Sequence, residues 1–330
     1  MTGTTATRIA GTGMFLPETV LTSAVLDRRL KLQAGTIEGF LGVRERRVTP
    51  LHQAVSDLAV PAAEAAIASS GLERAAIGLT ILATSTPDHP VPATAPQVAH
   101  RLGLRGPAFD LMNTCSGWLY ALATADAHLR AGTAQSALVI GANVLSRRLD
   151  WSGDWSTAGL FGDGAGAVVL TAGDGPGRLL ATALDADGTH WARIQVPAGG
   201  SRIPLTVEAV AQGQHMLRVA RAPGMLRESA DMLCATAHRA MAKAGLRAED
   251  VDWFLPHQAG ARLVESAAAQ LGIPPDHTLR NLQRYGNTSA ASIPMLLHEA
   301  ATDGTLQRGD ALLLGSVAAG MTSAAAVVRW

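Results

Sequence analysis

The fold of this chain is decided by AAEAAIASSGLERAAIGLTILATST, residues 62–86, a stretch that returns in related form as AHRAMAKAGLRAEDVDWFLPHQA, residues 237–259. Gly71 of the first copy matches Gly245 of the second, at an offset of 174 residues. Both copies are apolar-periodic segments that end at a glycine and continue into a short apolar run, which is typical of a helix followed by a strand. The sequence therefore contains an internal repeat, and a repeat fixes architecture before any motif is considered.

Two further landmarks keep nearly the same offset. RLGL from Arg101 matches QLGI from Gln270, and ALVIGA from Ala137 matches ALLLGS from Ala311. Each half thus predicts helices that alternate with apolar strands, and this pattern favours parallel sheets covered by helices. We expect a duplicated α/β fold with two halves related by a pseudo-dyad, residues 1–172 and residues 173–330. The glycine-rich AGDGPGR from Ala172 is the expected junction.

Composition restricts the classes of function. The 330 residues are 48% hydrophobic, enough for a large core, and the 27 acidic and 27 basic residues form no run of like charge that would attract nucleic acid or an anionic membrane. No apolar run approaches the ~20 residues that span a bilayer, and the N-terminus does not resemble a secretory signal. We expect a cytoplasmic protein whose partner is a small molecule or another protein. Two cysteines and ten scattered histidines predict neither disulfides nor a metal site.

Cys115 is the candidate nucleophile. It lies in NTCSGWLYAL, where small and polar residues precede an apolar-periodic stretch, as at a helix N-terminus. The helix dipole and free N–H groups at such a position favour the thiolate. A free cysteine is as often a small buried hydrophobe, the role we expect for Cys234, so the case for Cys115 depends on its companions.

The repeat supplies two companions. His257, in FLPHQAG, follows an apolar strand and takes the slot that Ala83 occupies in the first half, so only one copy carries an imidazole that can donate or accept a proton. Asn287, in YGNTSAASIP, is placed by the repeat opposite Cys115. Its amide is either a helix cap or a donor to a developing oxyanion.

Taken together, Cys115, the PHQA around His257 and the YGNTSAAS around Asn287 resemble the β-ketoacyl-ACP synthase III branch of the thiolase superfamily, over almost the whole chain. FGDGAGAVVL from Phe161 belongs to the same resemblance. Its glycines lead into a strand and no Lys follows, so they indicate close backbone packing instead of a phosphate loop. The resemblance implies a thiolase-like fold with α-β-α-β-α layers.

The resemblance also implies an acyltransferase reaction in two stages. An acyl group moves from a CoA or acyl-carrier-protein thioester to Cys115, and a malonyl or β-ketoacyl thioester then attacks it with loss of carbon dioxide. His257 and Asn287 would stabilise the enolate, while the backbone N–H groups of Cys115 and Ala319 would form the oxyanion hole. The resemblance further implies a homodimer, and it implies that the reaction needs no metal or redox cofactor.

Several positions depart from the pattern of the fatty-acid enzyme. Thr36 and Phe40 stand where the family has a Trp and an Arg that hold CoA, Trp155 replaces a second Arg, and Gly260 replaces an Asn that meets the pantetheine arm. These losses favour a carrier protein over free CoA as donor. Arg262 matches a family Arg near the carrier-docking entrance.

The expected substrate pocket differs as well. We assign Val91, Trp155, Phe161 and Met321 to it. Val91 aligns with a family Phe that projects from the partner subunit into the acyl pocket, and a smaller residue there leaves space for a bulkier chain. Met321 stands in for an aromatic residue. These changes favour specialised metabolism over primary lipid synthesis.

Two alternatives remain open. The acyl group on Cys115 could pass to an oxygen or nitrogen nucleophile with His257 as general base, or the chain could be a non-catalytic scaffold of the same fold. Retention of Asn287 favours condensation over the first alternative. The presence of all three candidate catalytic residues argues against the second. Hydroxymethylglutaryl-CoA synthase chemistry is less favoured, because it needs an added carboxylate base and Asp88 is the only nearby acid.

Overall fold

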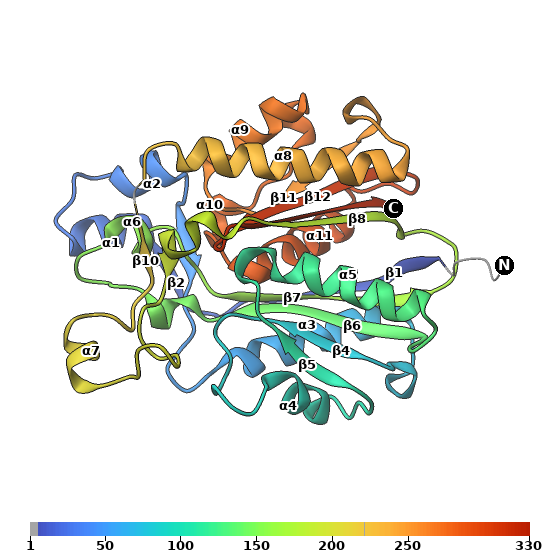
Figure 1. Cartoon of the computed structure of the whole chain (residues 1–330), viewed down its shortest axis with the longest axis horizontal. Coiled ribbons are helices and arrows are strands. Elements are labelled where there is room, and N and C mark those ends of the chain that lie inside the picture. Colours follow the sequence, from blue (N-terminus) through green and yellow to red (C-terminus); the bar gives the residue numbers. More distant parts are fainter. Residues whose placement is uncertain (1–5, 221) are drawn as a thin grey trace.

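The computed structural model describes residues 6–220 and 222–330, and within them nine strands form one continuous mixed sheet (Figure 1). Their order is β11-β12-β13-β8-β1-β7-β6-β4-β5. The bounds are β1 (Thr7–Phe15), β4 (Thr80–Ala83), β5 (Ala108–Leu111), β6 (Ser136–Asn143), β7 (Gly164–Ala172), β8 (Arg178–Ala186), β11 (Trp253–Pro256), β12 (Ala311–Ala318) and β13 (Thr322–Arg329).

The two halves of this sheet repeat one pattern of strand pairing. In the first, β4 is parallel to β5 and β6, and β7 runs antiparallel to β6 and β1. In the second, β11 is parallel to β12, and β13 runs antiparallel to β12 and β8. A parallel bridge from Phe254 to Thr278 takes the place of β5. The halves meet where Thr7 and Arg8 pair with Leu179 and Arg178.

Six main helices form three layers around these strands. Helices α3 (Val55–Ser70) and α4 (Thr94–Arg101) cover one outer face, and α8 (Met225–Ala244) and α9 (Ala261–Leu271) cover the other. Helices α5 (Gly117–Arg130) and α11 (Ser292–Thr302) share one apolar core with strands of both halves, and lie between them in Figure 1. The expected α-β-α-β-α layers are confirmed.

The sequence accounts for these elements directly. All eight residues of β6 and of β12 are buried, because helices cover both faces, and this explains why the strands are apolar throughout instead of alternating. Gly71 ends α3 with φ 69° and Gly245 ends α8 with φ 70°, so each supplies the left-handed cap that glycine adopts without steric cost. The matched glycines of the repeat are therefore matched helix ends. The division of the chain after residue 172 stays a prediction, although β7 ends at Ala172 and β8 begins at Arg178.

Shorter elements gather at one end of the sheet, on the left of Figure 1. They are β2 (Val20–Thr22), β3 (Glu45–Arg47), β9 (Ile194–Gln195), β10 (Arg218–Val219), α1 (Ser23–Arg29), α2 (Thr36–Leu41), α6 (Trp155–Ala158), α7 (Val207–Ala211) and α10 (Leu282–Tyr285). None of the helices in the described part of the chain combines the length and apolar character that crossing a bilayer requires.

The glycines of FGDGAG lie where other backbone comes close. A Cβ at Gly162 would stand 2.2 Å from the carbonyl oxygen of Tyr285, and one at Gly166 would stand 2.7 Å from the amide nitrogen of Met295. Gly164 faces the Met295 sulfur in the same way, at 2.8 Å. The prediction of close backbone packing is confirmed.

Gly162→Ala tests this contact. The added methyl would force the segment at Tyr285 away, and overpacking of this kind lowers the free energy of unfolding by about 1–3 kcal/mol. The matched control is Gly39→Ala in α2, where a Cβ meets nothing within 4 Å and where Ala is favoured over Gly in a helix by about 1 kcal/mol. Urea denaturation should show the first variant less stable than wild type and the second equal or more stable. Equal stability of both variants would contradict the contact.

Candidate active site

A cavity of about 210 Å³ contains all three predicted catalytic residues. Cys115 lies between β5 and α5, His257 directly follows β11, and Asn287 lies between α10 and α11. The side chains come from segments far apart in the sequence, so it is the fold that brings them together.

Cys115 lies on a sharp turn between strand and helix. β5 ends at Leu111, the short 3₁₀ turn η2 (Thr114–Ser116) follows, and α5 begins at Gly117. Thr114 has φ 44°, a left-handed conformation that costs a β-branched residue about 1–3 kcal/mol and is concentrated at functional sites. The turn places Cys115 on the wall of the cavity.

The second half contains the counterpart of this turn, and it corrects one prediction. The 3₁₀ turn η7 (Ser289–Ala291) precedes α11 as η2 precedes α5, and Ser289 has φ 53°. Matching the turns aligns Cys115 with Ala290. The prediction that Asn287 is the counterpart of Cys115 was therefore wrong in register, because Asn287 lies ahead of the turn.

Asn287 nevertheless reaches the nucleophile. Its side-chain amide lies close enough to the Cys115 thiol to lower the pKa of that thiol, while its Oδ1 accepts from the backbone N–H of Ser289 at 2.8 Å. Its own backbone N–H donates to the carbonyl of Leu160 at 2.8 Å, and its carbonyl accepts from Gly162 at 3.0 Å. Asn287 is thus a turn cap and a cavity donor at once, since its oxygen serves the first role and its nitrogen the second.

The pKa of Cys115 is shifted in the direction opposite to the one that a helix start predicts. Burial raises the pKa of Cys115 to about 11, and this outweighs the opposite effects of the Ser289 hydroxyl, the local backbone N–H and the Asn287 amide. Helix-end donors lower a thiol pKa where the sulfur is partly solvated. Cys115 is half-buried, and the loss of solvation at its sulfur is the largest effect on its pKa.

His257 has no partner for its ring. The residue is 4% exposed, and within the described chain neither Nδ1 nor Nε2 has a hydrogen bond. Its backbone N–H donates to the carbonyl of Gly315 at 2.8 Å, which fixes the residue against β12. Burial lowers the pKa of His257 to about 3. The imidazole is therefore neutral, with one N–H available to a ligand.

Two supporting residues were not predicted. Gln258 is buried, its Oε1 accepts from the backbone N–H groups of Asn281 at 3.2 Å and Leu282 at 3.1 Å, and its own N–H donates to Ser292 Oγ at 2.9 Å. These hydrogen bonds of Gln258 fix the position of the turn that contains His257. Ser289, whose hydroxyl lowers the pKa of the Cys115 thiol, is the other. Both lie inside the PHQA and YGNTSAAS motifs, so the signal was present in the sequence.

The other predicted pocket residues divide into two groups. Phe161, Ala319 and Met321 line the cavity. Trp155 does not line it, and Val91 is 83% exposed on the loop between β4 and α4. The assignment of Val91 to a partner's pocket stays a prediction.

Three of the four predicted entrance residues meet in a second hollow. Phe40, Gly260 and Arg262 line it, and the guanidinium of Arg262 lies 4.8 Å from the ring centroid of Phe40. The Trp155 ring packs edge-on against Phe40, 5.4 Å between centroids. Thr36 lies one turn from Phe40 on α2 but does not line the hollow. The hollow adjoins the cavity, because the two share Leu160, Met225, Ser229, Ala259 and Leu263.

The donors of this site are a thiol, an imidazole, an amide and hydroxyls. Within residues 6–220 and 222–330, no three His, Cys, Asp or Glu side chains lie close enough to hold a metal ion together. The arrangement suits acyl transfer, with a nucleophile beside neutral hydrogen-bond donors for a developing oxyanion.

The pKa of His257 predicts how stability depends on pH. The unfolded chain binds a proton on this residue below about pH 6.5, whereas the folded protein does so only near pH 3. Stability is therefore lost as the pH falls below 6.5, by up to about 1.4 kcal/mol per pH unit. Because Asn does not titrate, the free energy of unfolding of His257→Asn should fall less than that of the wild type as the pH is lowered. Parallel urea titrations at pH 6.5, 5.5 and 4.5 measure the difference, and equal losses in both proteins would contradict a neutral buried His257.

Comparisons with known proteins agree with this chemistry. The sequence models described as "3-Oxoacyl-[acyl-carrier-protein (ACP)] synthase III" and its "C terminal" part match residues 109–188 and 241–330. A 3-oxopimeloyl-[acyl-carrier-protein] synthase from Rhodothermus marinus is 46% identical, over 98% of this chain and 93% of the relative. A beta-ketoacyl-[acyl-carrier-protein] synthase III from Bradyrhizobium diazoefficiens is 42% identical, over 98% of each. The crystal structure of 3-oxoacyl-(acyl carrier protein) synthase III from Pseudomonas aeruginosa superposes with TM-score 0.90, at 37% identity over 98% of each chain.

Proposed function

Because this chain belongs to the 3-oxoacyl-[acyl-carrier-protein] synthase III family, we propose that Cys115, His257 and Asn287 carry out its decarboxylative condensation of acyl thioesters. The family assignment confirms the resemblance and the acyltransferase chemistry predicted from the sequence. The observation that carries the assignment of roles is the presence of two neutral donors, the His257 imidazole and the Asn287 amide, in the cavity that holds the thiol.

In the first stage the sulfur of Cys115 attacks the carbonyl carbon of an acyl thioester. A tetrahedral oxyanion forms, and the backbone N–H groups of Cys115 and Ala319 stabilise it. Collapse expels the donor's thiolate, which leaves as a thiol with the proton that Cys115 gave up. The acyl group remains on Cys115 as a new thioester, so one thioester is exchanged for another without a cofactor.

In the second stage a malonyl thioester loses carbon dioxide. The electron pair of the broken carbon–carbon bond forms an enolate, whose oxygen accepts hydrogen bonds from His257 and Asn287. The enolate carbon attacks the acyl carbonyl, and Cys115 leaves as thiolate. The product is a 3-oxoacyl thioester, two carbons longer than the acyl group on Cys115.

The transfer of the acyl group to oxygen or nitrogen is less well supported. That reaction needs His257 to remove a proton from an alcohol or amine. General-base catalysis is efficient when the pKa of the base is near the working pH, and burial lowers the pKa of His257 to about 3. A neutral imidazole of this kind serves better as a donor to an enolate.

Variants of the three residues separate the two stages. Cys115→Ala should give no acyl adduct in intact-protein mass spectrometry. His257→Ala and Asn287→Ala should still form the adduct, but should release carbon dioxide from malonyl thioester about 10²–10³-fold more slowly, the typical loss for one oxyanion donor. If the wild-type adduct disappears with an alcohol or amine and without carbon dioxide, condensation is the wrong reaction.

We further propose that the donor is borne on a carrier protein. Phe40 and Trp155 replace two cationic residues at the entrance by an aromatic pair, and Arg262, stacked on Phe40, keeps one positive charge there. One guanidinium on an aromatic face is a sparse site for the phosphates of CoA but a usable contact for an acidic carrier. The altered entrance also supports a role in specialised metabolism, in a homodimer to which Val91 contributes.

The donor is tested by acylation of Cys115 from matched acyl-CoA and acyl-carrier-protein. Carrier-borne acyl groups should react faster, and Arg262→Ala should slow them about two- to fivefold, as expected for a contact worth up to 1 kcal/mol, while leaving the CoA rate nearly unchanged. Faster acylation from CoA in the wild type would reject the carrier as donor.

A further inference from the structure

Arg193 is among the residues that line the active-site cavity. The residues around it there are mostly apolar, among them Leu145, Phe161, Ile194 and Leu217, and the Arg193 side chain is only 18% exposed. We propose, resting on the condensation reaction above, that the acyl group placed on Cys115 ends in a carboxylate and that Arg193 binds it. The substrate class is then the thioester of a short dicarboxylic acid.

Arg193 lines the cavity but not the entrance hollow, although its partner Glu228 lies on α8 between Met225 and Ser229, which line both. The residues shared by the cavity and the entrance hollow come from the start of α8, the start of α9 and Leu160. Arg193, His190 and Ile194 line the cavity only, as do Leu217 and Val219 of the facing segment. When an acyl group enters past Phe40 and reacts with Cys115, its end remote from the thioester can therefore lie against this wall of the cavity.

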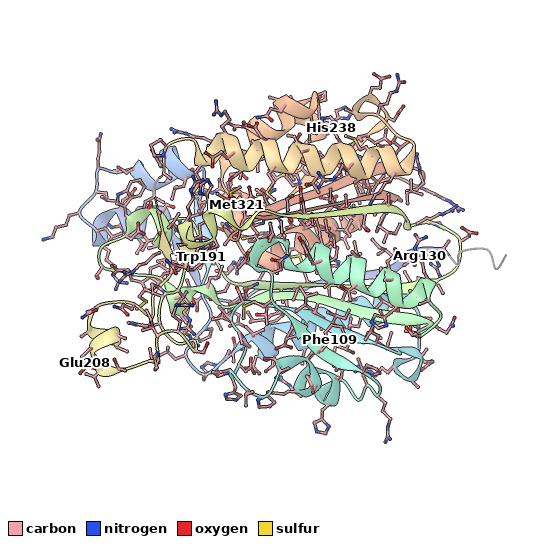
Figure 2. All side chains as sticks on the ribbon, in the orientation of Figure 1. Phe109, Arg130, Trp191, Glu208, His238 and Met321 are labelled. Atoms are coloured by element: carbon pink, nitrogen blue, oxygen red, sulfur yellow. The ribbon has the colours of Figure 1, made fainter. Side chains whose placement is uncertain are left out.

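Several contacts fix Arg193 at that wall. It ends the 3₁₀ turn η4 (Gly188–Arg193), and its carbonyl accepts from the N–H of Ala220 at 2.7 Å, beside the pairing of β9 with β10. At the start of the turn, Asp187 and Met321 exchange both backbone hydrogen bonds, at 2.8 and 2.9 Å. Figure 2 shows the side chains of this region, with Trp191 of the turn and Met321 labelled. The backbone that carries Arg193 is thus tied to a residue of the cavity.

The ion pair of Arg193 leaves it able to bind a ligand. Its Nη1 donates to Oε2 of Glu228, and this bond lowers the pKa of the Glu228 carboxyl. A guanidinium has five donor hydrogens, so most remain for another acceptor. Glu228 is 38% exposed on its side chain, so it is the more solvated member of the pair. Of the two members of this ion pair, Arg193 lines the cavity and Glu228 does not.

The chemistry of a guanidinium selects the ligand. Its planar fork matches the two oxygens of a carboxylate, and it binds them most strongly where water is largely excluded. His190, on the same wall, offers a further ring nitrogen. The Rhodothermus marinus relative is named for 3-oxopimeloyl, a seven-carbon acyl group with a terminal carboxylate. Because condensation with malonyl adds two carbons, such a product arises from a five-carbon acyl group with the same terminus.

The experiment compares two acyl groups of equal length on Cys115. Glutaryl and pentanoyl thioesters of pantetheine are reacted with wild type, Arg193→Met, Arg193→Lys and Glu228→Gln, without malonyl thioester, and adduct formation is followed by mass spectrometry. We expect wild type to prefer glutaryl. Arg193→Met should slow glutaryl at least about tenfold, as for a lost charge-assisted hydrogen bond, and leave pentanoyl unchanged or faster. Arg193→Lys should restore part of the preference, and Glu228→Gln should retain it.

Each other result overturns the inference. An equal loss for both acyl groups in Arg193→Met and Glu228→Gln would mean that the ion pair only maintains the fold. If Arg193→Met formed the glutaryl adduct at the wild-type rate, the guanidinium would have to bind another ligand. One such ligand is the carboxylate of malonyl thioester, which is absent from this step. Failure of the proposed function is a separate result, since wild type would then form no adduct with either thioester.

Discussion

The hydrogen bonds between Asn287 and the segment 160–162 are the constraint on which the site depends. They join a loop of the second half to the segment that precedes β7 in the first, where Gly162 has no Cβ to keep Tyr285 away. With the backbone of Asn287 held by these bonds, its side-chain oxygen caps η7, and its amide lies close enough to Cys115 to lower the pKa of the thiol. The donor is thus positioned before any substrate binds, which is the condition for electrostatic stabilisation of an oxyanion.

Burial determines the charge state of the site. It raises the pKa of Cys115 and lowers that of His257, so the free enzyme holds a neutral thiol beside a neutral imidazole. For both groups the loss of solvation on burial is the largest cause of the pKa shift, and it disfavours the charged form. The Cys115 thiol and the His257 imidazole are therefore both uncharged before substrate binds, and negative charge develops beside them during the reaction.

Much of the fold and part of the site could be predicted from the sequence. The internal repeat predicted the layered fold, because Gly71 and Gly245 mark equivalent helix ends. The sequence motifs predicted Cys115, His257 and Asn287 as site residues. The alignment of Cys115 with Asn287 failed because the register is set by the left-handed turns at Thr114 and Ser289, which no residue type announces. The pKa of a thiol depends on how tightly the final fold encloses it, which a local helix-start pattern cannot report.

Arg193 illustrates the same limit. In the sequence it is one arginine in an irregular stretch, and a charged residue there is usually solvated. Its place on the cavity wall depends on the pairing of β9 with β10 and on the hydrogen bonds between Asp187 and Met321, which join segments distant in sequence. Residues that depend on such long-range contacts become visible only in the folded chain.

The layer formed by α5 and α11 has a consequence for the molecule as a whole. Its apolar side chains belong to one core with strands from both sides of the sheet, including Leu122 and Ile293 from the helices and Val139 and Leu314 from the strands. If the chain were cut between β7 and β8 and the fragments separated, each fragment would expose to water the apolar surface that it buries against the other. The two fragments would have to reassociate to exclude that water. The two halves of the chain thus pack against each other as the subunits of a dimer do, but they are covalently linked and cannot dissociate.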